Sequence, residues 1–213
     1  MQRKELCPGD IMCQFYSNNS LTSFLTGRII AFGQLVTGNH HCNIVHAGIM
    51  FDSIYSIEAL NKGIRARDLR IQNVNERYLV FRPVNKNLAQ GAADCANMMV
   101  KIHFAQRGPH AKNGPMPYDA KGAVKSIFGT GNGPMGPAAM DSLLDKILAA
   151  QEHPFFCSQF VVFVYQFVAE QSGLRAASLF NLADPKVPPA RLATYMDTSP
   201  NFQFVGELER GVR

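Results

Sequence analysis

The segment from Cys157 to Gln171 constrains the fold of this chain most strongly. Its apolar residues recur at the spacing of one helix face, and Gly173 stands just past the point where such a helix would end. These apolar residues are Phe160, Val161, Val164, Phe167 and Val168. A helix with an apolar face of this length has to bury it against other elements. The segment therefore predicts a packed helix that begins at a cysteine.

Short apolar runs bounded by turn residues predict strands that this helix could pack against. The runs 43–51 and 54–59 flank Asp52-Ser53 and are typical of an antiparallel hairpin. Further strands are expected within 5–15, where an apolar run follows the turn Cys7-Pro8-Gly9-Asp10, and at 78–83 and 202–208. Other helical patterns cover 21–36, 88–106, 141–151 and the Pro-led stretch 185–196. Together these elements predict an α+β fold with an antiparallel sheet packed against the helix of Cys157.

The stretch 107–138 differs in composition from the rest of the chain, because it holds seven glycines and five prolines. Long irregular segments in compact domains are usually functional, so we expect a flap over a binding cleft. Tyr118 lies in this stretch and could either donate a hydrogen bond to an oxyanion or simply pack within the loop. With 213 residues, the chain is expected to be a single domain, residues 1–213, that carries the flap as an insertion.

Composition excludes several classes of protein. Apolar residues make up 46% of the chain and charged residues 17%, which supports a packed core and argues against global disorder. The net charge of +5 favours acidic partners, but no basic motif interleaved with aromatic residues occurs, so nucleic acid is not an expected partner. We find no apolar run of transmembrane length and no secretory signal, and therefore expect synthesis in the cytoplasm. The five cysteines form no CxxC pair, as is usual for reduced thiols.

Cys157 is a candidate nucleophile because of its place at the start of the predicted helix. The positive end of the helix dipole and the free N–H groups of the first turn favour a thiolate, which is the nucleophilic form. The same N–H groups could stabilise an oxyanion. The alternative interpretation is a buried structural cysteine, which is common for free thiols.

His46 lies within an apolar strand, so its ring needs a polar partner. If the hairpin turns about Asp52, His46 lies directly opposite Glu58 and both side chains project from the same face. A carboxylate beside the imidazole would fix its tautomer and support its charged form. The alternatives are a core histidine whose hydrogen bonds are satisfied elsewhere and an exposed carboxylate at the end of a strand.

A zinc site is a further hypothesis, because His40, His41, Cys42 and His46 lie within seven residues of one another. However, the segment runs from a turn into a strand, where alternate residues point apart. No second Cys/His pair at ligand spacing follows. We therefore expect neither a metal nor another cofactor.

Taken in order, the motifs resemble the permuted NlpC/P60 cysteine hydrolases, a group with YiiX/YebB-like members that is distantly related to lecithin:retinol acyltransferase-like proteins. The order and approximate spacing of the motifs hold over nearly the whole chain. Gln159 departs from the pattern, because family members often carry an acidic residue there. The matching segments are Pro8-Gly9-Asp10-Ile11, His46-Ala47-Gly48-Ile49, Ile57-Glu58-Ala59, Gly63-Ile64, Pro117-Tyr118-Asp119, Phe156-Cys157-Ser158-Gln159-Phe160-Val161 and 189–192.

The resemblance implies a circularly permuted papain-like fold, in which the histidine strand precedes the nucleophile helix. It implies that Cys157 is the nucleophile, that His46 is the general base, that Glu58 orients the histidine and that Tyr118 is an active-site tyrosine. The expected reaction is cleavage of amide bonds in peptidoglycan stem peptides. A thioester-forming lipid hydrolase or acyltransferase and a non-catalytic binding module are the alternatives.

This substrate raises the question of where the protein works. A wall-cutting enzyme made without a signal is expected to act on wall fragments in the cytosol or to leave through a specialised secretion system as an antibacterial effector. In the second case, a component of that secretion system or an immunity protein would be its partner.

Overall fold

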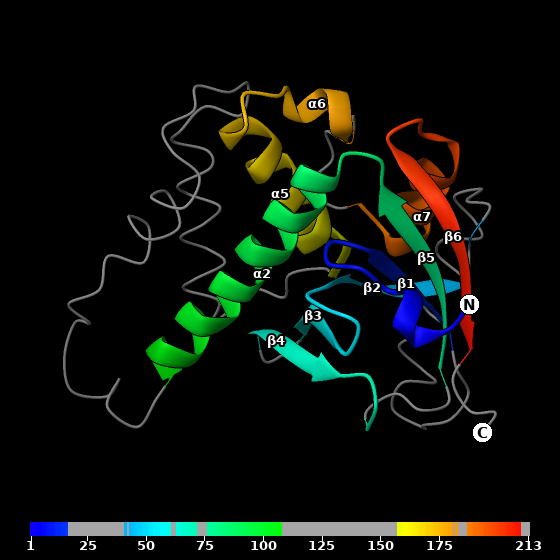
Figure 1. Ribbon diagram of the computed structural model, residues 1–213, viewed down its shortest axis with the longest axis horizontal. Helices are drawn as coiled ribbons and strands as arrows, with labels where there is room; N and C mark the ends of the chain where they lie inside the picture. The colour runs from blue at the N-terminus through cyan, green and yellow to red at the C-terminus, as the bar shows by residue number, and fades with distance from the viewer. Residues whose placement is uncertain are drawn as a thin grey trace.

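The computed structural model describes residues 1–16, 41, 43–60, 63–71, 76–107, 157–180, 182 and 187–209. Several sequence predictions lie outside these residues: the helices at 21–36 and 141–151, and the Gly/Pro-rich flap beyond residue 107, which includes Tyr118. The described residues have an α+β architecture, in which helices pack on an antiparallel sheet (Figure 1).

The sheet has six strands in the order β4-β3-β2-β1-β5-β6, and each neighbouring pair is antiparallel. Successive residues of a strand point to opposite faces of the sheet, so each strand contributes apolar residues to two layers. The strands are β1 (Ile11–Phe15), β2 (Ile44–Met50), β3 (Tyr55–Leu60), β4 (Gly63–Asp68), β5 (Arg77–Pro83) and β6 (Phe202–Glu209).

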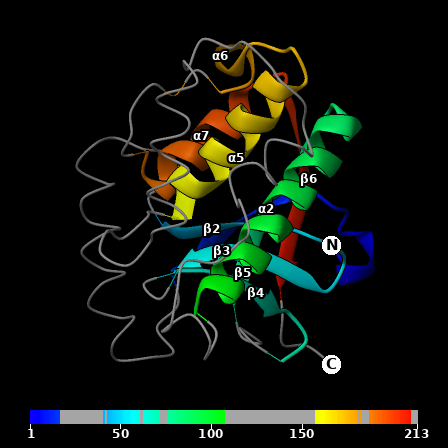
Figure 2. The same ribbon diagram turned by 90° about the vertical axis from the view of Figure 1, so that its left-hand side faces the viewer.

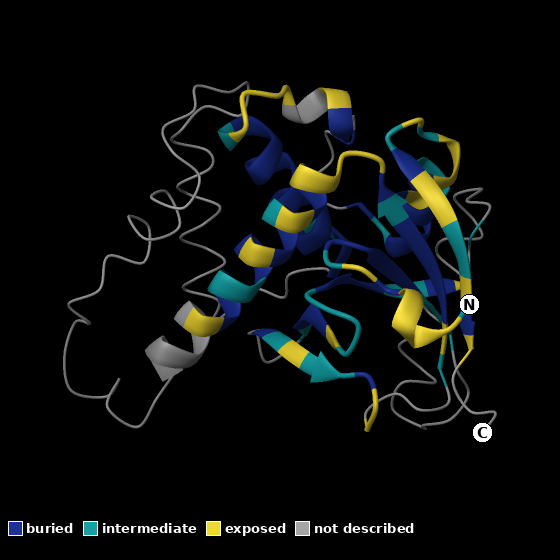
Figure 3. Ribbon diagram, viewed as in Figure 1, coloured by how far each residue is buried: buried dark blue, intermediate teal, exposed yellow. Residues whose placement is uncertain are grey.

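The helices come from three parts of the chain. They are the short η1 (Arg3–Glu5), then α2 (Lys86–Arg107), and then α5 (Cys157–Gln171), α6 (Ala176–Leu179) and α7 (Pro189–Thr198). The turned view places α2 and α5 in front of the sheet (Figure 2), and α7 contacts α5 and the strands β2, β5 and β6. Nearly every residue of α5 is buried, because the helix contacts α2, α6, α7 and the strands β2 and β3 (Figure 3).

The core has two parts, one on each face of the sheet. Ile11 and Cys13 of β1 belong to the larger cluster, which also contains the apolar residues of α2, α5 and α7. Met12 lies between them in sequence and belongs to a smaller cluster on the other face, together with Met50 and Tyr78. The strict alternation along β1 shows that this strand is covered on both sides, which is why its sequence is apolar at consecutive positions.

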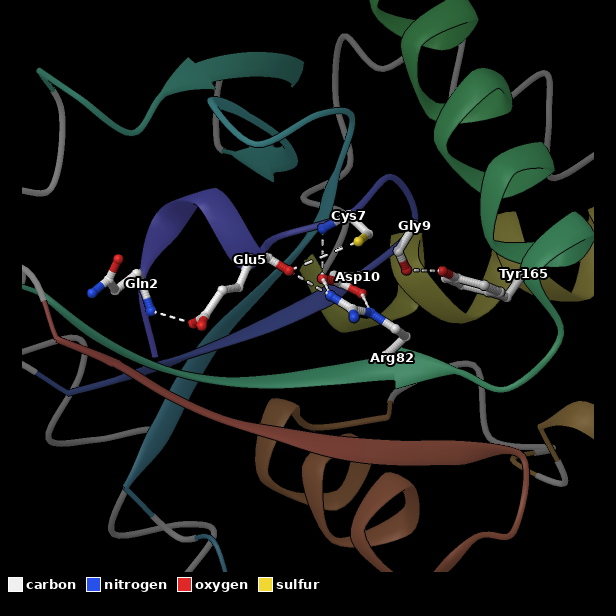
Figure 4. Close-up of polar contacts among 7 residues, drawn as sticks. All are labelled: Gln2, Glu5, Cys7, Gly9, Asp10, Arg82 and Tyr165. Atoms are coloured by element: carbon white, nitrogen blue, oxygen red, sulfur yellow. Dashed lines mark hydrogen bonds and ion pairs between the residues drawn. The ribbon is translucent and has the colours of Figure 1, made fainter.

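The turn before β1 ties the sheet to both long helices. Gly9 has a φ of +80°, and a Cβ atom there would lie 2.2 Å from the carbonyl oxygen of Ala89 in α2. The hydroxyl of Tyr165 in α5 donates a hydrogen bond to the Gly9 carbonyl (Figure 4). Burial and the charge of Asp10 raise the pKa of Tyr165 well above its usual value, so the hydroxyl keeps the proton that it donates.

The same turn contains a buried ion pair. Asp10 is 0% exposed, and its two carboxylate oxygens each lie 2.7 Å from a nitrogen of the Arg82 guanidinium (Figure 4). The backbone N–H of Cys7 also donates to this carboxylate at 2.8 Å. The Pro8-Gly9-Asp10 motif is therefore a structural device that fixes the start of β1 against β5 and the helices.

The predicted hairpin of β2 and β3 is confirmed, but its predicted register is wrong by two residues. The paired residues are Ile49 with Ile57 and Met50 with Ser56, so the ladder does not place His46 directly opposite Glu58. Asp52 does not stand at the apex of the turn. Its carboxylate accepts the N–H groups of Ile54 and Tyr55, both at 2.7 Å, so Asp52 begins the turn and the centre moves one residue further along. Because the shift is even, the side chains still project from the same face.

The strands predicted within 5–15, at 78–83 and at 202–208 are confirmed as β1, β5 and β6, and the helices at 88–106 and 157–171 as α2 and α5. The Pro-led stretch forms α7, which begins at Pro189. Strand β4 was not predicted as a strand. No helix in the described ranges combines the length and the apolar character that crossing a membrane requires.

Candidate active site

Cys157 is the first residue of α5 and lies against β2. It is 7% exposed. Its sulfur accepts hydrogen bonds from the backbone N–H groups of Ala47 and Ser158, and it forms a further hydrogen bond with His46. The thiol is thus surrounded by donors at the positive end of a helix, which is an arrangement that stabilises a thiolate.

His46 connects the thiol to a carboxylate on the neighbouring strand. Its Nε2 lies 2.8 Å from Oε2 of Glu58, so Nδ1 is the ring nitrogen left for Cys157. The side chain of His46 is 17% exposed and that of Glu58 only 1%. A thiol, an imidazole and a carboxylate in this order form the arrangement by which proteins activate a nucleophilic cysteine.

The charges in this arrangement support one another. Burial would raise the pKa of Cys157, but the charge of His46 and the hydrogen bonds to the sulfur outweigh burial, and the pKa of the thiol falls below its usual value. Burial would also lower the pKa of His46, but the negative charges of Cys157 and Glu58 outweigh it, and the pKa of the ring rises well above its usual value. Both shifts favour a thiolate beside an imidazolium.

Two other buried cysteines show that this state is not a general property of buried thiols in the chain. Cys13 in β1 and Cys95 in α2 are both 0% exposed, and burial raises the pKa of each thiol. The negative charge of Cys157 raises the pKa of Cys13 further. Cys157 is also buried, at 7% exposed, but the imidazole of His46 and the backbone N–H donors lower the pKa of its thiol.

Three side chains hold the carboxylate of Glu58. Oε2 accepts from His46 and from Arg67 of β4, at 2.8 and 2.9 Å, and Oε1 accepts from the hydroxyl of Ser56 at 2.6 Å. Burial alone would raise the pKa of Glu58, but His46, Arg67 and Ser56 together lower it to about 2. The buried carboxylate is therefore ionised and aimed at the imidazole.

Gly48 provides the room for this contact. The ladder between β2 and β3 ends at the Ile49–Ile57 pair, and Gly48 is the next residue of β2 toward His46. An ideal Cβ on Gly48 would stand 2.7 Å from Cγ of Glu58. Because Gly48 has no side chain, Glu58 can pass over it and reach His46 diagonally.

The structure thus brings together three of the four predicted site residues, Cys157, His46 and Glu58. Tyr118 lies outside the described residues. Of the residues in the zinc hypothesis, His40 and Cys42 are also outside, and His41 lies 3.4 Å from Asp197 of α7, whereas His46 contacts Glu58. Within the described part of the chain, no group of three or more His, Cys, Asp or Glu residues is placed to hold a metal ion.

Sequence reasoning missed Ser56 and Arg67. Ser56 had a usable signal, because a residue two positions before Glu58 in a strand points to the same face. No comparable signal pointed to Arg67, because strand β4 was not predicted. It pairs with Ser56 across the β3–β4 ladder, and this places its guanidinium beside the carboxylate of Glu58.

Comparison of the chain with protein-family models, with curated proteins and with solved structures finds no match.

Proposed function

We propose that this protein is a cysteine hydrolase of the permuted papain-like (NlpC/P60) type. The observation that carries the proposal is the buried chain of contacts from Cys157 through His46 to Glu58, in which the pKa of the thiol is lowered and that of the imidazole is raised. A buried thiolate–imidazolium pair supported by an ionised carboxylate is suited to nucleophilic attack on a carbonyl carbon.

The order of the elements also supports the proposed fold. The strand of His46 comes first, the strand of Glu58 follows it, and the helix of Cys157 comes much later and packs on the same antiparallel sheet. This is the order that a permuted papain-like hydrolase would have. The motif at Gly9 and Asp10, part of the same resemblance, serves the fold and has no place in the proposed chemistry.

The proposed reaction has two stages. The Cys157 thiolate attacks the carbonyl carbon of an amide, and N–H groups of the first turn of α5 stabilise the oxyanion. His46 gives its proton to the departing amine as the C–N bond breaks, which leaves a thioester on Cys157. His46 then takes a proton from water, and the resulting attack releases the carboxylic acid and restores the thiolate. Glu58 stabilises the imidazolium in both stages.

We propose stem peptides of peptidoglycan as the substrate. The test is incubation of the protein with purified peptidoglycan and, separately, with phospholipid vesicles, with products identified by mass spectrometry. Cys157→Ala is the inactive variant, and Cys7→Ala, which removes an exposed thiol, is its matched control. Muropeptides with newly freed amino and carboxyl groups, present with Cys7→Ala and absent with Cys157→Ala, are the expected result.

Other outcomes would overturn parts of the proposal. Release of fatty acid that depends on Cys157 would replace the amide bond with a lipid ester and keep the nucleophile. Product formation that survives Cys157→Ala would remove Cys157 from the chemistry.

A further inference from the structure

One oxygen of Glu58 is shared between two cationic side chains. Oε2 lies 2.8 Å from Nε2 of His46 and 2.9 Å from a terminal nitrogen of the Arg67 guanidinium. Ser56 occupies the other oxygen at 2.6 Å. The carboxylate cannot move toward or away from one cation without changing its contact with the other, so Arg67 and His46 are coupled through it.

The register of the sheet brings Arg67 to this position. In the β3–β4 ladder, Ser56 lies opposite Arg67, and Glu58 lies opposite Arg65. Arg67 therefore reaches Glu58 along the diagonal. The side chain of Arg67 is 21% exposed and that of Glu58 is 1% exposed, so this ion pair is only weakly screened by solvent.

The four groups form a row of alternating charge: thiolate, imidazolium, carboxylate and guanidinium. Other titratable groups lie around the row. Cys13 of β1 is close enough to Cys157 for the two thiols to interact electrostatically. On the far side, Tyr78 and Glu76 interact with Arg67, and the Tyr78 hydroxyl donates to Glu76 at 2.8 Å.

We propose that Arg67 is a positioning residue of the candidate site: it holds the Glu58 carboxylate against His46 and sets the pH range in which the thiolate–imidazolium pair exists. The inference rests on the proposed role of Cys157 and His46, and deepens it. It concerns the electrostatic balance of the site, because the guanidinium of Arg67 and the imidazole of His46 share one oxygen of the Glu58 carboxylate.

The sign of the effect follows from the charges. Without the guanidinium, the negative charge of Glu58 is no longer offset. The surroundings of both groups therefore become more negative. They disfavour the thiolate of Cys157 and favour the imidazolium of His46, so the pKa of each group rises. Loss of Arg67 should therefore shift both limits of the pH range of the pair upward.

The test measures alkylation of Cys157 by iodoacetamide across pH 4 to 10, with peptide mapping, and needs no substrate. The variants are Arg67→Met, which removes the charge and the hydrogen bond, Arg67→Gln, which keeps a donor without the charge, and Arg67→Lys, which keeps the charge. Arg65→Met is the matched control, since it removes the same charge from the same strand, and Arg65 has no ion pair among the described residues. Circular dichroism establishes that each variant is folded.

In Arg67→Met and Arg67→Gln, the pH at which alkylation of Cys157 begins to accelerate should shift upward. At the acidic end of this rise, alkylation should be roughly tenfold slower than in the wild type. Arg67→Lys and Arg65→Met should follow the wild type. Should Arg67→Met fail to fold, Arg67→Gln against Arg67→Lys makes the same comparison.

The failures are distinguishable. The inference about Arg67 is overturned if the uncharged Arg67 variants are folded and keep the wild-type pH profile of alkylation. It is also overturned if Arg67→Lys has the same profile as the uncharged variants. In both cases the proposed function stands. If wild-type Cys157 reacts no faster at low pH than the exposed Cys7, the activated pair itself is absent, and the proposed function is overturned.

Discussion

The side chain of Glu58 occupies the space beside Gly48 that a Cβ atom would fill. The distance from an ideal Cβ on Gly48 to Cγ of Glu58 would be 2.7 Å, which is shorter than side chains tolerate. The carboxylate therefore reaches His46 across a residue that has to be glycine. The glycine is as much a part of the site geometry as the residues that carry charge.

Substitution of Gly48 by alanine should disturb the site through Glu58. The new methyl group displaces the carboxylate from His46, so we expect slower alkylation of Cys157 at pH 6 and a lower melting temperature. A double-mutant cycle with Glu58→Ala checks the cause. In the Glu58→Ala background the substitution should have little further effect on alkylation, and an undiminished effect there would mean that Gly48 acts through some other contact.

Cys157 should be the most reactive thiol of the chain at low pH. An ordinary thiol with a pKa of about 8.5 is roughly 0.3% thiolate at pH 6, whereas the pKa of Cys157 is lowered by His46 despite burial. Brief iodoacetamide treatment at pH 6 with peptide mapping should therefore label Cys157 ahead of Cys7, Cys13, Cys42 and Cys95.

The variant His46→Ala provides the control for this prediction. It leaves the position of Cys157 at the start of α5 unchanged and removes the imidazolium, so the low-pH reactivity should disappear. Labelling of Cys157 that is unchanged in His46→Ala would assign the reactivity to the helix terminus alone.

Glu58→Gln should lower turnover and change how stability depends on pH. The pKa of Glu58 is depressed to about 2, so its ionised form contributes stability that is present above the usual range near pH 4.5 and is lost as the pH falls toward 2. The gap in unfolding free energy between wild type and Glu58→Gln should be largest above pH 5, at roughly 3 kcal/mol, and should close in acid. Urea unfolding at several pH values measures it.

The surface ion pair between Arg77 and Glu207 supplies the comparison for this measurement. Glu207 lies 2.7 Å from Arg77 but is 42% exposed, so Glu207→Gln should have only a small effect on the unfolding free energy at any pH. If the difference in unfolding free energy between wild type and Glu58→Gln does not change with pH, the ionised state of Glu58 is contradicted.

Gly9→Ala should destabilise the fold more than Gly173→Ala does. Both glycines have a positive φ, of +80° and +75°, but only a Cβ on Gly9 would meet backbone atoms, those of Ala89. We expect a loss of roughly 1 to 2 kcal/mol for Gly173→Ala from its φ alone, and about 1 to 3 kcal/mol more for Gly9→Ala from the clash with α2. Thermal or urea unfolding compares the two, and equal losses would show that α2 yields at this point.

Local patterns were sufficient to predict the helix of Cys157 and the strands that carry His46 and Glu58. The helix is marked by an apolar periodicity that no strand has, and the two strands are marked by apolar runs around a turn signal. The resemblance to a known family added the order of the motifs. No comparison tests this resemblance, so it supports the proposed function only as a proposal.

The features that could not be predicted depend on contacts between distant residues. The register of the hairpin was missed because the carboxylate of Asp52 caps the turn, which the count of loop residues does not reveal. Strand β4 was missed because its sequence, GIRARD, is short and has only two apolar residues, Ile64 and Ala66, in alternation with its arginines. Arg67 is explained by its partner on β3, because its contact with Glu58 only becomes visible once the strands are paired.

The hydrogen bond from Tyr165 to the Gly9 carbonyl joins residues that are 156 positions apart in the chain. During synthesis, β1 to β5 and α2 leave the ribosome well before α5 is made, so the helix that carries Cys157 joins five strands that are already made, whereas β6 follows it. Contacts of such long range close late and slow the folding of a chain. The thiol therefore meets His46 only near the end of folding, and a nascent chain that stops short of α5 holds the imidazole and the carboxylate without the nucleophile.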